Sequence, residues 1–271
     1  MYGTKVRAEW WKVPLQFKIQ NAKFKISGLT PIVMRNYRNV PKVIIMNKKI
    51  LLIDLDNTLI DFNECARHSI INAFEELGFT YTEKVFETFI EENVKIWKRL
   101  EKGEITKPKL RATRWNLILA RLGIDFDGTI IEEMFENGVA KGAYPVDGAY
   151  DLLNHLHGKY KMYIVSNGFR FVQESRLKIG DFEKYFDGVF VSEDIGIPKP
   201  AKEFFDYCFK NLDNPDKNEV ILIGDSLSAD ILGGVNYVID TIWFNKNNEP
   251  ANDDIKPTYT VNKLKDIEKI L

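Results

Sequence analysis

Two stretches of the sequence place a pair of aspartates one residue apart, so that the two carboxylates of a pair could act together. Asp54 and Asp56 lie in LLIDLDNTLI, and Asp125 and Asp127 lie in IDFDGTII. A carboxylate can attack an electrophilic centre as a nucleophile, and it is a preferred ligand of hard cations such as Mg²⁺. Only one of the two pairs can belong to a single active site. The secondary structure expected around each pair indicates which one it is.

The first pair follows Ile50–Ile53, a continuous apolar run of the kind found in strands that are buried on both faces. The Asp54 carboxylate should therefore emerge at the carboxyl edge of a sheet. In an extended chain Asp56, two residues on, points the same way. This placement favours the first pair as the chemical one.

The second pair follows LILARLG, a helical run in which Gly123 is a natural left-handed end. Thr129 and Glu132 have the spacing of a capping box at the start of another helix. We therefore predict that residues 125–129 form a loop between two helices.

From Met46 onward, short apolar runs alternate with helical patterns, which predicts an α/β fold with a doubly wound, Rossmann-like parallel sheet. Residues 63–141 break this alternation, because their apolar residues recur only at helical spacing. We predict that they form an all-helical insertion after the first strand. The expected strands are Ile50–Ile53, Met162–Val165, Val189–Val191, Val220–Ile223 and Thr241–Phe244, and the expected helices include Ala149–His157, Phe171–Ile179 and Lys202–Phe209.

More polar residues lie where these strands end. Ser166 ends the second strand in YIVSNG, Lys199 lies in IPKP, and Asp225 follows a strand in ILIGDSLSAD, with Asp230 five residues on. A doubly wound sheet gathers its ligands at the carboxyl ends of its strands, so we expect these side chains to meet Asp54.

In this order and on these strands, DLDNT, VSN, PKP and GDSLSAD resemble the four motifs of the haloacid dehalogenase superfamily of phosphatases. The resemblance covers residues 46–271. It implies a core formed by residues 46–62 and 142–271 and a mobile helical cap formed by residues 63–141. The second aspartate, Asp56, is absent from the dehalogenases themselves, so the expected reaction is hydrolysis of a phosphate ester.

The resemblance also implies roles for individual residues. Asp54 would be the nucleophile that forms an aspartyl-phosphate, Asp56 the general acid and base, and Lys199 a charge that orients Asp54. Mg²⁺ would be the cofactor. Its expected ligands are Asp54, Asp225 and the backbone carbonyl of Asp56, supported by Asp230; the phosphoryl group would be held by Ser166 and by amides near Asn57 and Asn167.

The stretches LEKGEITKPKLRATRW, GDSLSADILGG and IDTIWFN resemble one branch of the superfamily, the pyrimidine 5′-nucleotidases. The chain departs from that branch at Tyr237 and Val238, where its members tend to carry a small residue and glycine. Phe62 has two interpretations, a platform for a nucleotide base or a packing residue of the cap hinge. For Arg111 and Arg114 we expect a solvated position on an amphipathic helix; the alternative is a contact with the phosphate or the base of the substrate.

We therefore expect a phosphatase that acts on a nucleoside 5′-monophosphate, with a pyrimidine base. A sugar phosphatase or phosphomutase is the enzymatic alternative, and a binding module without turnover is the non-enzymatic one. A phosphonate-cleaving enzyme would need a Schiff-base lysine in the cap, for which the residues are Lys95, Lys98 and Lys102. The expected partner is a small phosphorylated metabolite, with no stable nucleic-acid or membrane partner, on a monomer or homodimer.

Composition places limits on other classes of protein. Cys65 and Cys208 are too few for a disulfide framework or a thiolate metal site, and we expect them to pack in the interior. His155 and His157 form His-x-His but point to different faces of one helix, so we expect them and His68 to lie at the surface or to pack, without binding a metal. No apolar run approaches the roughly 18 residues of a membrane span, and no signal peptide is evident, which predicts a cytoplasmic protein.

Residues 1–45 differ in charge from the rest of the chain. They are strongly basic, with Glu9 as their only acidic residue, whereas residues 46–271 are net acidic. We expect a segment outside the enzyme; the alternative is a basic, aromatic arm that contacts nucleic acid or a membrane surface.

Overall fold

The computed structural model describes residues 48–250 and 254–271, and the expectation for residues 1–45 lies outside them. Its six strands form one parallel sheet in the order β3-β2-β1-β4-β5-β6. The strands are β1 (Ile50–Ile53), β2 (Lys161–Ser166), β3 (Gly188–Val191), β4 (Val220–Gly224), β5 (Asp240–Phe244) and β6 (Tyr259–Val261). This order confirms the predicted doubly wound fold.

The sixth strand, β6, is missing from the sequence expectation. It pairs with β5 at the edge of the sheet and is three residues long, of which only Val261 is buried. So short a strand carries too little apolar periodicity to be recognised from sequence.

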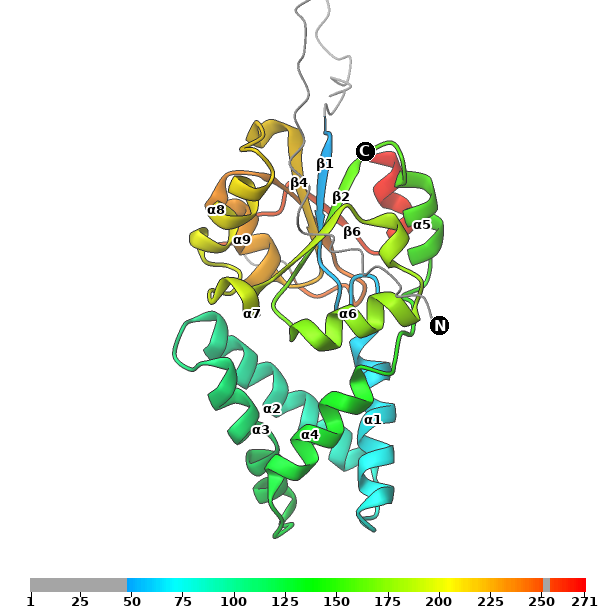
Figure 1. The fold of residues 1–271 in the computed structure, drawn as a ribbon, viewed down its shortest axis with the longest axis vertical. Helices are drawn as coiled ribbons and strands as arrows, with labels where there is room; N and C mark the ends of the chain where they lie inside the picture. Colours follow the sequence, from blue (N-terminus) through cyan, green and yellow to red (C-terminus); the bar gives the residue numbers. More distant parts are fainter. Residues whose placement is uncertain (1–47, 251–253) are drawn as a thin grey trace, which may run out of the picture. The chain divides into compact units, whose positions relative to one another are not determined.

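Helices cover both faces of the sheet (Figure 1). Leu51 and Ile53 of β1 pack into one core with α5 and α6, whereas Leu52 packs into a second core with α8 and α9. Alternate side chains of a strand point to opposite faces, which is why a continuous apolar run marks it. The core helices are α5 (Ala149–Leu156), α6 (Arg170–Ile179), α7 (Ser192–Ile195), α8 (Lys202–Asn211) and α9 (Leu232–Tyr237), with shorter turns at Glu183–Tyr185, Lys217–Glu219, Leu227–Ile231 and Leu264–Lys269.

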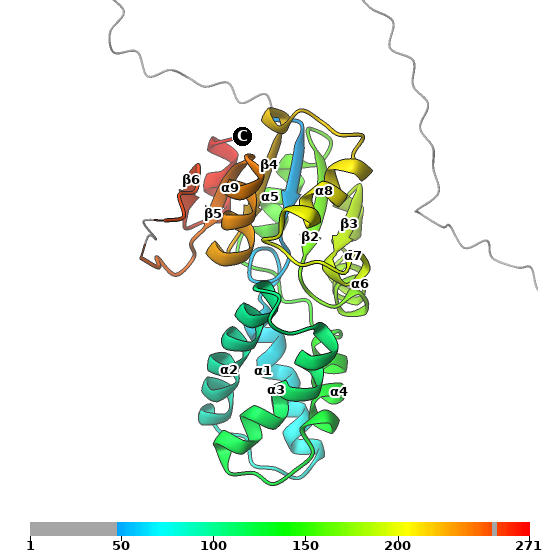
Figure 2. The ribbon, with the colours of Figure 1, turned by 90° about the vertical axis from the view of Figure 1, so that its left-hand side faces the viewer.

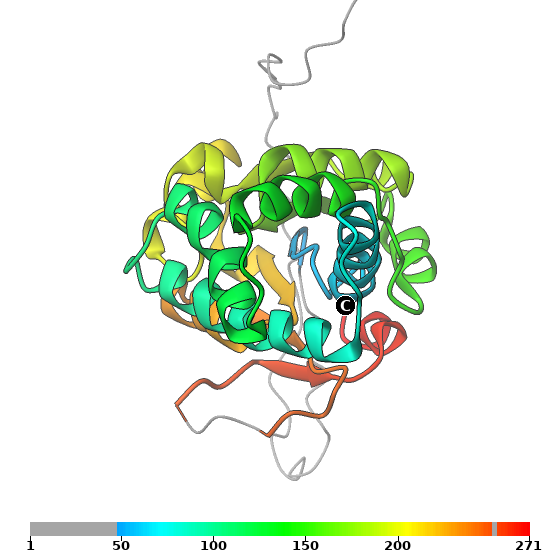
Figure 3. The ribbon, with the colours of Figure 1, turned by 90° about the horizontal axis from the view of Figure 1, so that it is seen from below.

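The insertion after β1 is all-helical, as predicted; Figure 2 shows it beyond one end of the sheet, and Figure 3 shows its helices in front of the sheet when the molecule is seen from that end. Its helices are α1 (Phe62–Glu76), α2 (Glu83–Glu101), α3 (Lys107–Leu122) and α4 (Gly128–Val139). They pack around an aromatic centre in which the ring of Phe89 lies 5.7 Å from that of Trp115 and 5.0 Å from that of Phe135. Buried aromatic residues supply much of the packing area of such a small bundle.

The second aspartate pair lies in the turn between α3 and α4, as predicted, but the turn ends at Asp127 and not at Thr129, because α4 begins at Gly128. Gly123 ends α3 with a φ of 70°, and Asp125 is exposed. The predicted capping box is wrong, because Asp127 is the N-cap of α4 and accepts a hydrogen bond from the Thr129 backbone amide at 2.9 Å. Glu132 instead turns into the bundle, where it pairs with Arg114.

Candidate active site

The polar residues named from the sequence converge at the carboxyl ends of β1, β2 and β4. Ile53 of β1 lies opposite Ile164 of β2 and Ile223 of β4, and this register brings the following residues to one edge. Asp54 extends the hydrogen bonding between β1 and β4 by one residue, since its backbone amide donates to the Ile223 carbonyl at 2.9 Å. Ser166 is the last residue of β2, and Asp225 directly follows β4.

Lys199 is the centre of the cluster. Its ammonium donates to Asp54 Oδ1 at 2.8 Å, to Asp230 Oδ1 at 2.6 Å and to the Val165 carbonyl at 2.6 Å. Burial lowers the pKa of Lys199, but the Asp230 and Asp54 carboxylates outweigh it and hold the net pKa above its ordinary value. Lys199 therefore remains a cation that neutralises part of the charge at this edge.

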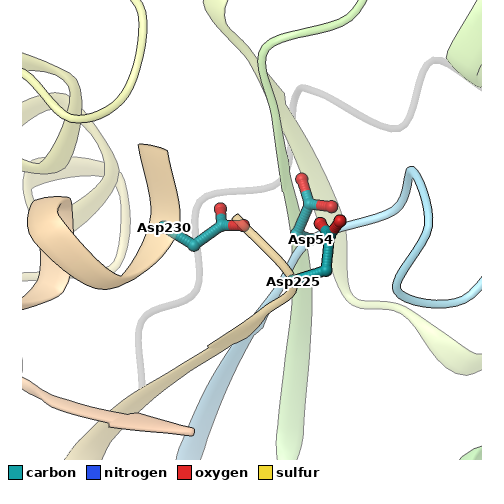
Figure 4. A group of neighbouring side chains, drawn as sticks. All are labelled: Asp54, Asp225 and Asp230. Carbon is teal, nitrogen blue, oxygen red and sulfur yellow. The ribbon is translucent and has the colours of Figure 1, made fainter. Parts of the chain in front are cut away.

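Asp54, Asp225 and Asp230 bring carboxylate oxygens within 4.8 Å of one another, and Figure 4 shows the three side chains converging. Burial raises the pKa of Asp54 to about 7, against the pull of Lys199 and with the help of Asp230 and Asp56. Burial and the neighbouring carboxylates also raise the pKa of Asp225 well above its usual range. One ammonium thus faces three carboxylates, an excess of negative charge that a divalent cation with oxygen ligands would neutralise.

The oxygens of Asp230 are both in use within the protein. Oδ1 accepts from Lys199, and Oδ2 accepts from the Ser226 amide at 3.1 Å. Gly224 makes this packing possible, because a Cβ atom at this position would lie 2.3 Å from the Asp230 carboxyl group. Asp54 Oδ2 and Asp225 Oδ1, by contrast, have only long contacts with the Thr58 hydroxyl, at 3.3 and 3.5 Å, so these two carboxylates are the more open to a cation.

Two residues that sequence reasoning did not assign hold Asp225. The Thr58 hydroxyl accepts from the Asp225 amide at 3.1 Å and lies 3.3 Å from Asp54 Oδ2, so it connects both carboxylate-bearing loops. The Trp243 indole of β5 donates to the Asp225 carbonyl at 2.9 Å. Thr58 belongs to the DLDNT motif, so the sequence held a signal for it, but Trp243 is identified only by the fold.

Asp56 is held by the helix that follows β2. Its carboxylate forms an ion pair with Arg176 and accepts from Gln173 Nε2 at 2.6 Å. Arg176 is fully buried, and its other nitrogens reach Cys65 Sγ and the Gly142 carbonyl at 3.6 and 3.3 Å, respectively. Sequence reasoning missed both α6 residues, because nothing in their local pattern indicates a partner more than a hundred residues away.

The predicted phosphoryl-binding residues lie beside this cluster, and the structure shows which of their atoms are already engaged. Ser166 Oγ accepts from Gly168 N and Gln173 Nε2, and its hydroxyl proton remains available. The Asn167 side chain clamps the Lys199 backbone, donating to its carbonyl at 2.9 Å and accepting from its amide at 2.8 Å. The Asn57 backbone amide donates to the Ile60 carbonyl within the loop that follows β1.

A cavity of about 260 Å³ opens onto these residues and is closed on its other side by the helical insertion. Phe62 lines it at the start of α1, with its ring 6.4 Å from that of Phe89, so both interpretations of Phe62 have a structural basis. The remaining cap residues of the lining all come from α2: Asn93, Val94, Trp97, Lys98 and Glu101. Sequence reasoning named none of them as binding residues except Lys98, as a Schiff-base candidate.

The insertion also touches the core directly. Lys107 donates to the Gly168 carbonyl, Arg111 pairs with Glu136 of the insertion and Glu193 of the core, and Ser228 donates to Glu101 at 2.7 Å. The solvated position expected for Arg111 is thus replaced by a bridge between insertion and core.

The expectation for Arg114 is wrong. Its side chain is only 2% exposed, forms an ion pair with Glu132 and lies 4.7 Å above the Phe135 ring. An arginine this deep is stable only when it is paired, and the partner lies on a different helix, which helical spacing alone does not reveal.

Neither the cysteines nor the histidines form a site of their own. Cys65 and Cys208 are free and buried, as expected, and burial raises the pKa of Cys208 to about 12, which makes it unreactive. Of the histidines, His68 stacks on Tyr144, His155 lies near Glu268, and His157 packs edge-on against Tyr185. Within the described ranges, the aspartate triad is the only group suited to a metal ion.

Residues 48–236 match the family of haloacid dehalogenase-like hydrolases. The chain belongs to this family. Two pyrimidine 5′-nucleotidases are among the relatives of this hydrolase: YjjG of Escherichia coli, 33% identical over 82% of this chain and 96% of YjjG, and PynA of Streptococcus pneumoniae, 32% identical over 81% and 93%.

A further relative, the HAD-hydrolase YfnB of Bacillus subtilis, is 34% identical over 82% of this chain and 94% of its own. The crystal structure of YfnB bound to magnesium matches the hydrolase with a TM-score of 0.79, covering 83% of this chain and 98% of that one, and it reveals interdomain movement. Dehalogenases at 15 to 18% identity share the fold.

Among the residues that the structure describes, none of the helices combines the length and the apolar character needed to cross a membrane. The cytoplasmic location stays a prediction.

Proposed function

We propose that the chain is a Mg²⁺-dependent phosphatase of phosphate monoesters, with a pyrimidine nucleoside 5′-monophosphate as its substrate. The observation that carries the reaction is the buried Asp54 carboxylate, held at 2.8 Å by Lys199 beside Asp225 at the floor of a cavity. The names of YjjG and PynA support the choice of substrate.

Asp54 and Asp225 would hold the metal, together with the backbone carbonyl of Asp56, as the sequence motifs imply. The donor set fits Mg²⁺, since it consists of hard oxygens and carries more negative charge than Lys199 balances. When bound, Mg²⁺ would screen the repulsion between the nucleophile and the phosphoryl oxygens. The YfnB structure bound to magnesium supports this choice of ion.

Asp54 would attack phosphorus in line and form an aspartyl-phosphate, which water then hydrolyses. Lys199 keeps the carboxylate in place through Oδ1, and the Ser166 hydroxyl has a proton free for a phosphoryl oxygen. Asp56 would protonate the leaving oxygen and later take a proton from the hydrolytic water. Arg176 holds one oxygen of this carboxylate and Gln173 the other, so each oxygen keeps a lone pair that can carry the transferred proton.

The helical insertion would close over the bound substrate and exclude water from the reaction. The contacts of Lys107, Arg111 and Glu101 with the core are polar, and the two basic residues also lie over the ring of Phe169. Such side-chain contacts, unlike backbone pairing, can form and break in a reversible closure. The interdomain movement of YfnB supports this proposal.

The test is release of inorganic phosphate from a panel of nucleoside monophosphates and sugar phosphates, with Mg²⁺ and with excess chelator. We expect Mg²⁺-dependent turnover that is fastest on uridine or thymidine monophosphate. Turnover on sugar phosphates alone would keep the reaction and discard the substrate. Absence of turnover on every ester would contradict the enzymatic function and favour a binding module.

A further inference from the structure

Asn93 of α2 has an orientation that its neighbours fix. Its Oδ1 accepts one hydrogen bond from Arg114 Nη1 at 3.0 Å and another from Trp97 Nε1 at 3.1 Å. Both partners are donors that have no lone pair to offer, so only the oxygen of the amide can face them. The Asn93 NH₂ group must therefore point the other way.

The partner that matters most for this orientation is itself immobile. Arg114 is 2% exposed, its Nε donates to Glu132 at 3.1 Å, and its guanidinium lies over the Phe135 ring. The ion pair and the aromatic contact leave the guanidinium no second position. The cap interior thus holds the Asn93 oxygen, and with it the direction of the amide nitrogen.

The nitrogen of Asn93 has no partner of its own. The residue is only 8% exposed, yet Nδ2 makes no hydrogen bond to any residue in the part of the chain that the structure describes. Asn93 lines the cavity that also contains Asp54 and Lys199. Nδ2 is not sealed inside the bundle but keeps accessible surface where Asn93 lines the cavity, so it is an unused donor that an incoming acceptor can reach.

The surroundings of this donor indicate the chemistry of the acceptor. Phe62, Val94 and Trp97 supply apolar and aromatic wall on the cap side of the same cavity. A planar ring can lie against such a wall while an oxygen at its edge accepts from the amide. The volume of about 260 Å³ is below the range of roughly 300–1,000 Å³ for small-molecule sites, which favours a single-ring base.

We propose that Asn93 is a specificity-determining residue whose NH₂ group donates to a ring carbonyl oxygen of the pyrimidine base. This inference rests on the proposed nucleotidase function and adds the contact by which the base is recognised. Uracil, thymine and cytosine each carry such an oxygen, whereas adenine carries none, so the contact also selects against adenosine monophosphate.

The decisive variant is Asn93→Asp. It keeps an oxygen for Arg114 and Trp97, exchanges the donor that faces the cavity for an acceptor, and adds a carboxylate charge beside the Arg114 guanidinium. A base-free phosphate ester meets the same added charge and therefore controls for it. We expect kcat/KM for uridine monophosphate to fall by at least about tenfold, because two acceptors would then face each other. For ribose 5-phosphate, which lacks a base, we expect a change of less than about twofold. Asn137→Asp, on an exposed position of α4, is the matched control.

The two substrates separate the possible outcomes. Equal losses on both, or no loss on uridine monophosphate, would overturn the role of Asn93 and leave the nucleotidase function standing. A wild-type enzyme that does not prefer uridine monophosphate over ribose 5-phosphate would overturn the nucleotidase function, and the base contact with it.

A measurement on the wild-type enzyme covers the case in which Asn93→Asp does not fold. Sulfur is a weaker acceptor than oxygen, so either 2-thiouridine or 4-thiouridine monophosphate should lose about fivefold or more in kcat/KM against uridine monophosphate. Equal rates on all three nucleotides would contradict the proposed contact.

Discussion

The two walls of the cavity are built in different ways. On the core side, Asp54, Ser166 and Asp225 are placed by the ends of neighbouring parallel strands, and Lys199 connects them. On the cap side, α2 supplies most of the lining residues. The orientation of one of them, Asn93, depends on Arg114, which is paired with Glu132 inside the bundle. Backbone hydrogen bonds between strands thus determine where the polar groups of the core wall lie. Side-chain packing between helices determines the shape and polarity of the cap wall, which would contact the rest of the substrate.

This difference indicates where substitutions can change the substrate preference without loss of the reaction. Substitutions in the cap interior can reorient residues such as Asn93 while the strand ends keep their geometry. The core offers no such freedom, because its charges are buried together and each depends on the others. The predictions that follow test whether the two walls are separable in this way.

The largest effect is expected for Lys199→Met. Removal of the ammonium leaves Asp54 and Asp230 as buried carboxylates without their common partner, which should cost about 3–5 kcal/mol of unfolding free energy and nearly all activity. Thermal unfolding and phosphate release measure both effects. Lys202→Met, which removes an exposed ion pair, is the control. A Lys199→Met enzyme with near-normal stability and turnover would show that the buried charges of the core wall do not depend on one another.

A second effect of similar origin is expected in the cap for Arg114→Met. The variant leaves Glu132 buried and unpaired, so unfolding free energy should fall by about 3 kcal/mol. The double variant Arg114→Met with Glu132→Gln should recover part of that loss, because the buried charge disappears with its partner. Chemical denaturation of the three proteins measures this, and a double variant less stable than the single one would contradict the account.

Arg176→Lys probes the contact between α6 and Asp56. A lysine retains the charge but lacks the planar guanidinium whose other nitrogens donate to Cys65 and Gly142, so Asp56 should be held in place less firmly. We expect kcat to fall by about 10- to 100-fold while KM changes by less than about threefold, as suits a positioning residue. Lys178→Arg on the same helix is the control. A rise in KM as large as the fall in kcat would indicate that Arg176→Lys impairs substrate binding and not the positioning of Asp56.

The smallest effect is expected for Val238→Gly, at the end of α9 and far from both walls. Val238 has a φ of 60° and is 75% exposed, a conformation that a β-branched residue adopts only under strain. Relief of that strain should exceed the entropy cost of glycine and raise stability by up to about 1 kcal/mol. A thermal melt tests the gain, kcat/KM should not change, and a lower melting temperature would contradict the argument.

The sequence predicted the core wall far better than the cap wall, and the reason is physical. Asp54, Ser166 and Asp225 each follow an apolar run, and parallel strands bring such positions to one edge whatever the loops between them do. Arg114 was expected in solvent, because a single helix pattern does not reveal that Glu132 faces it from α4. The contact of Asp56 with Arg176 escaped prediction for the same reason, since it joins two elements far apart in the chain.

The helices of the insertion were predictable as elements, whereas the functional surface they form was not. Phe89 and Trp97 recur at helical spacing and indicate α2, yet the same spacing does not tell which side meets the cavity. The orientation of Asn93 requires knowledge of both its donors, and these are visible only in the folded bundle.

The most direct test of the account is phosphate release from uridine monophosphate in the presence of Mg²⁺ by the wild-type enzyme and by Asp54→Asn. The variant preserves shape and removes the proposed nucleophile, so its activity should fall by about a thousandfold or more. Retention of more than about a few per cent of wild-type activity would contradict the central claim that Asp54 carries the reaction.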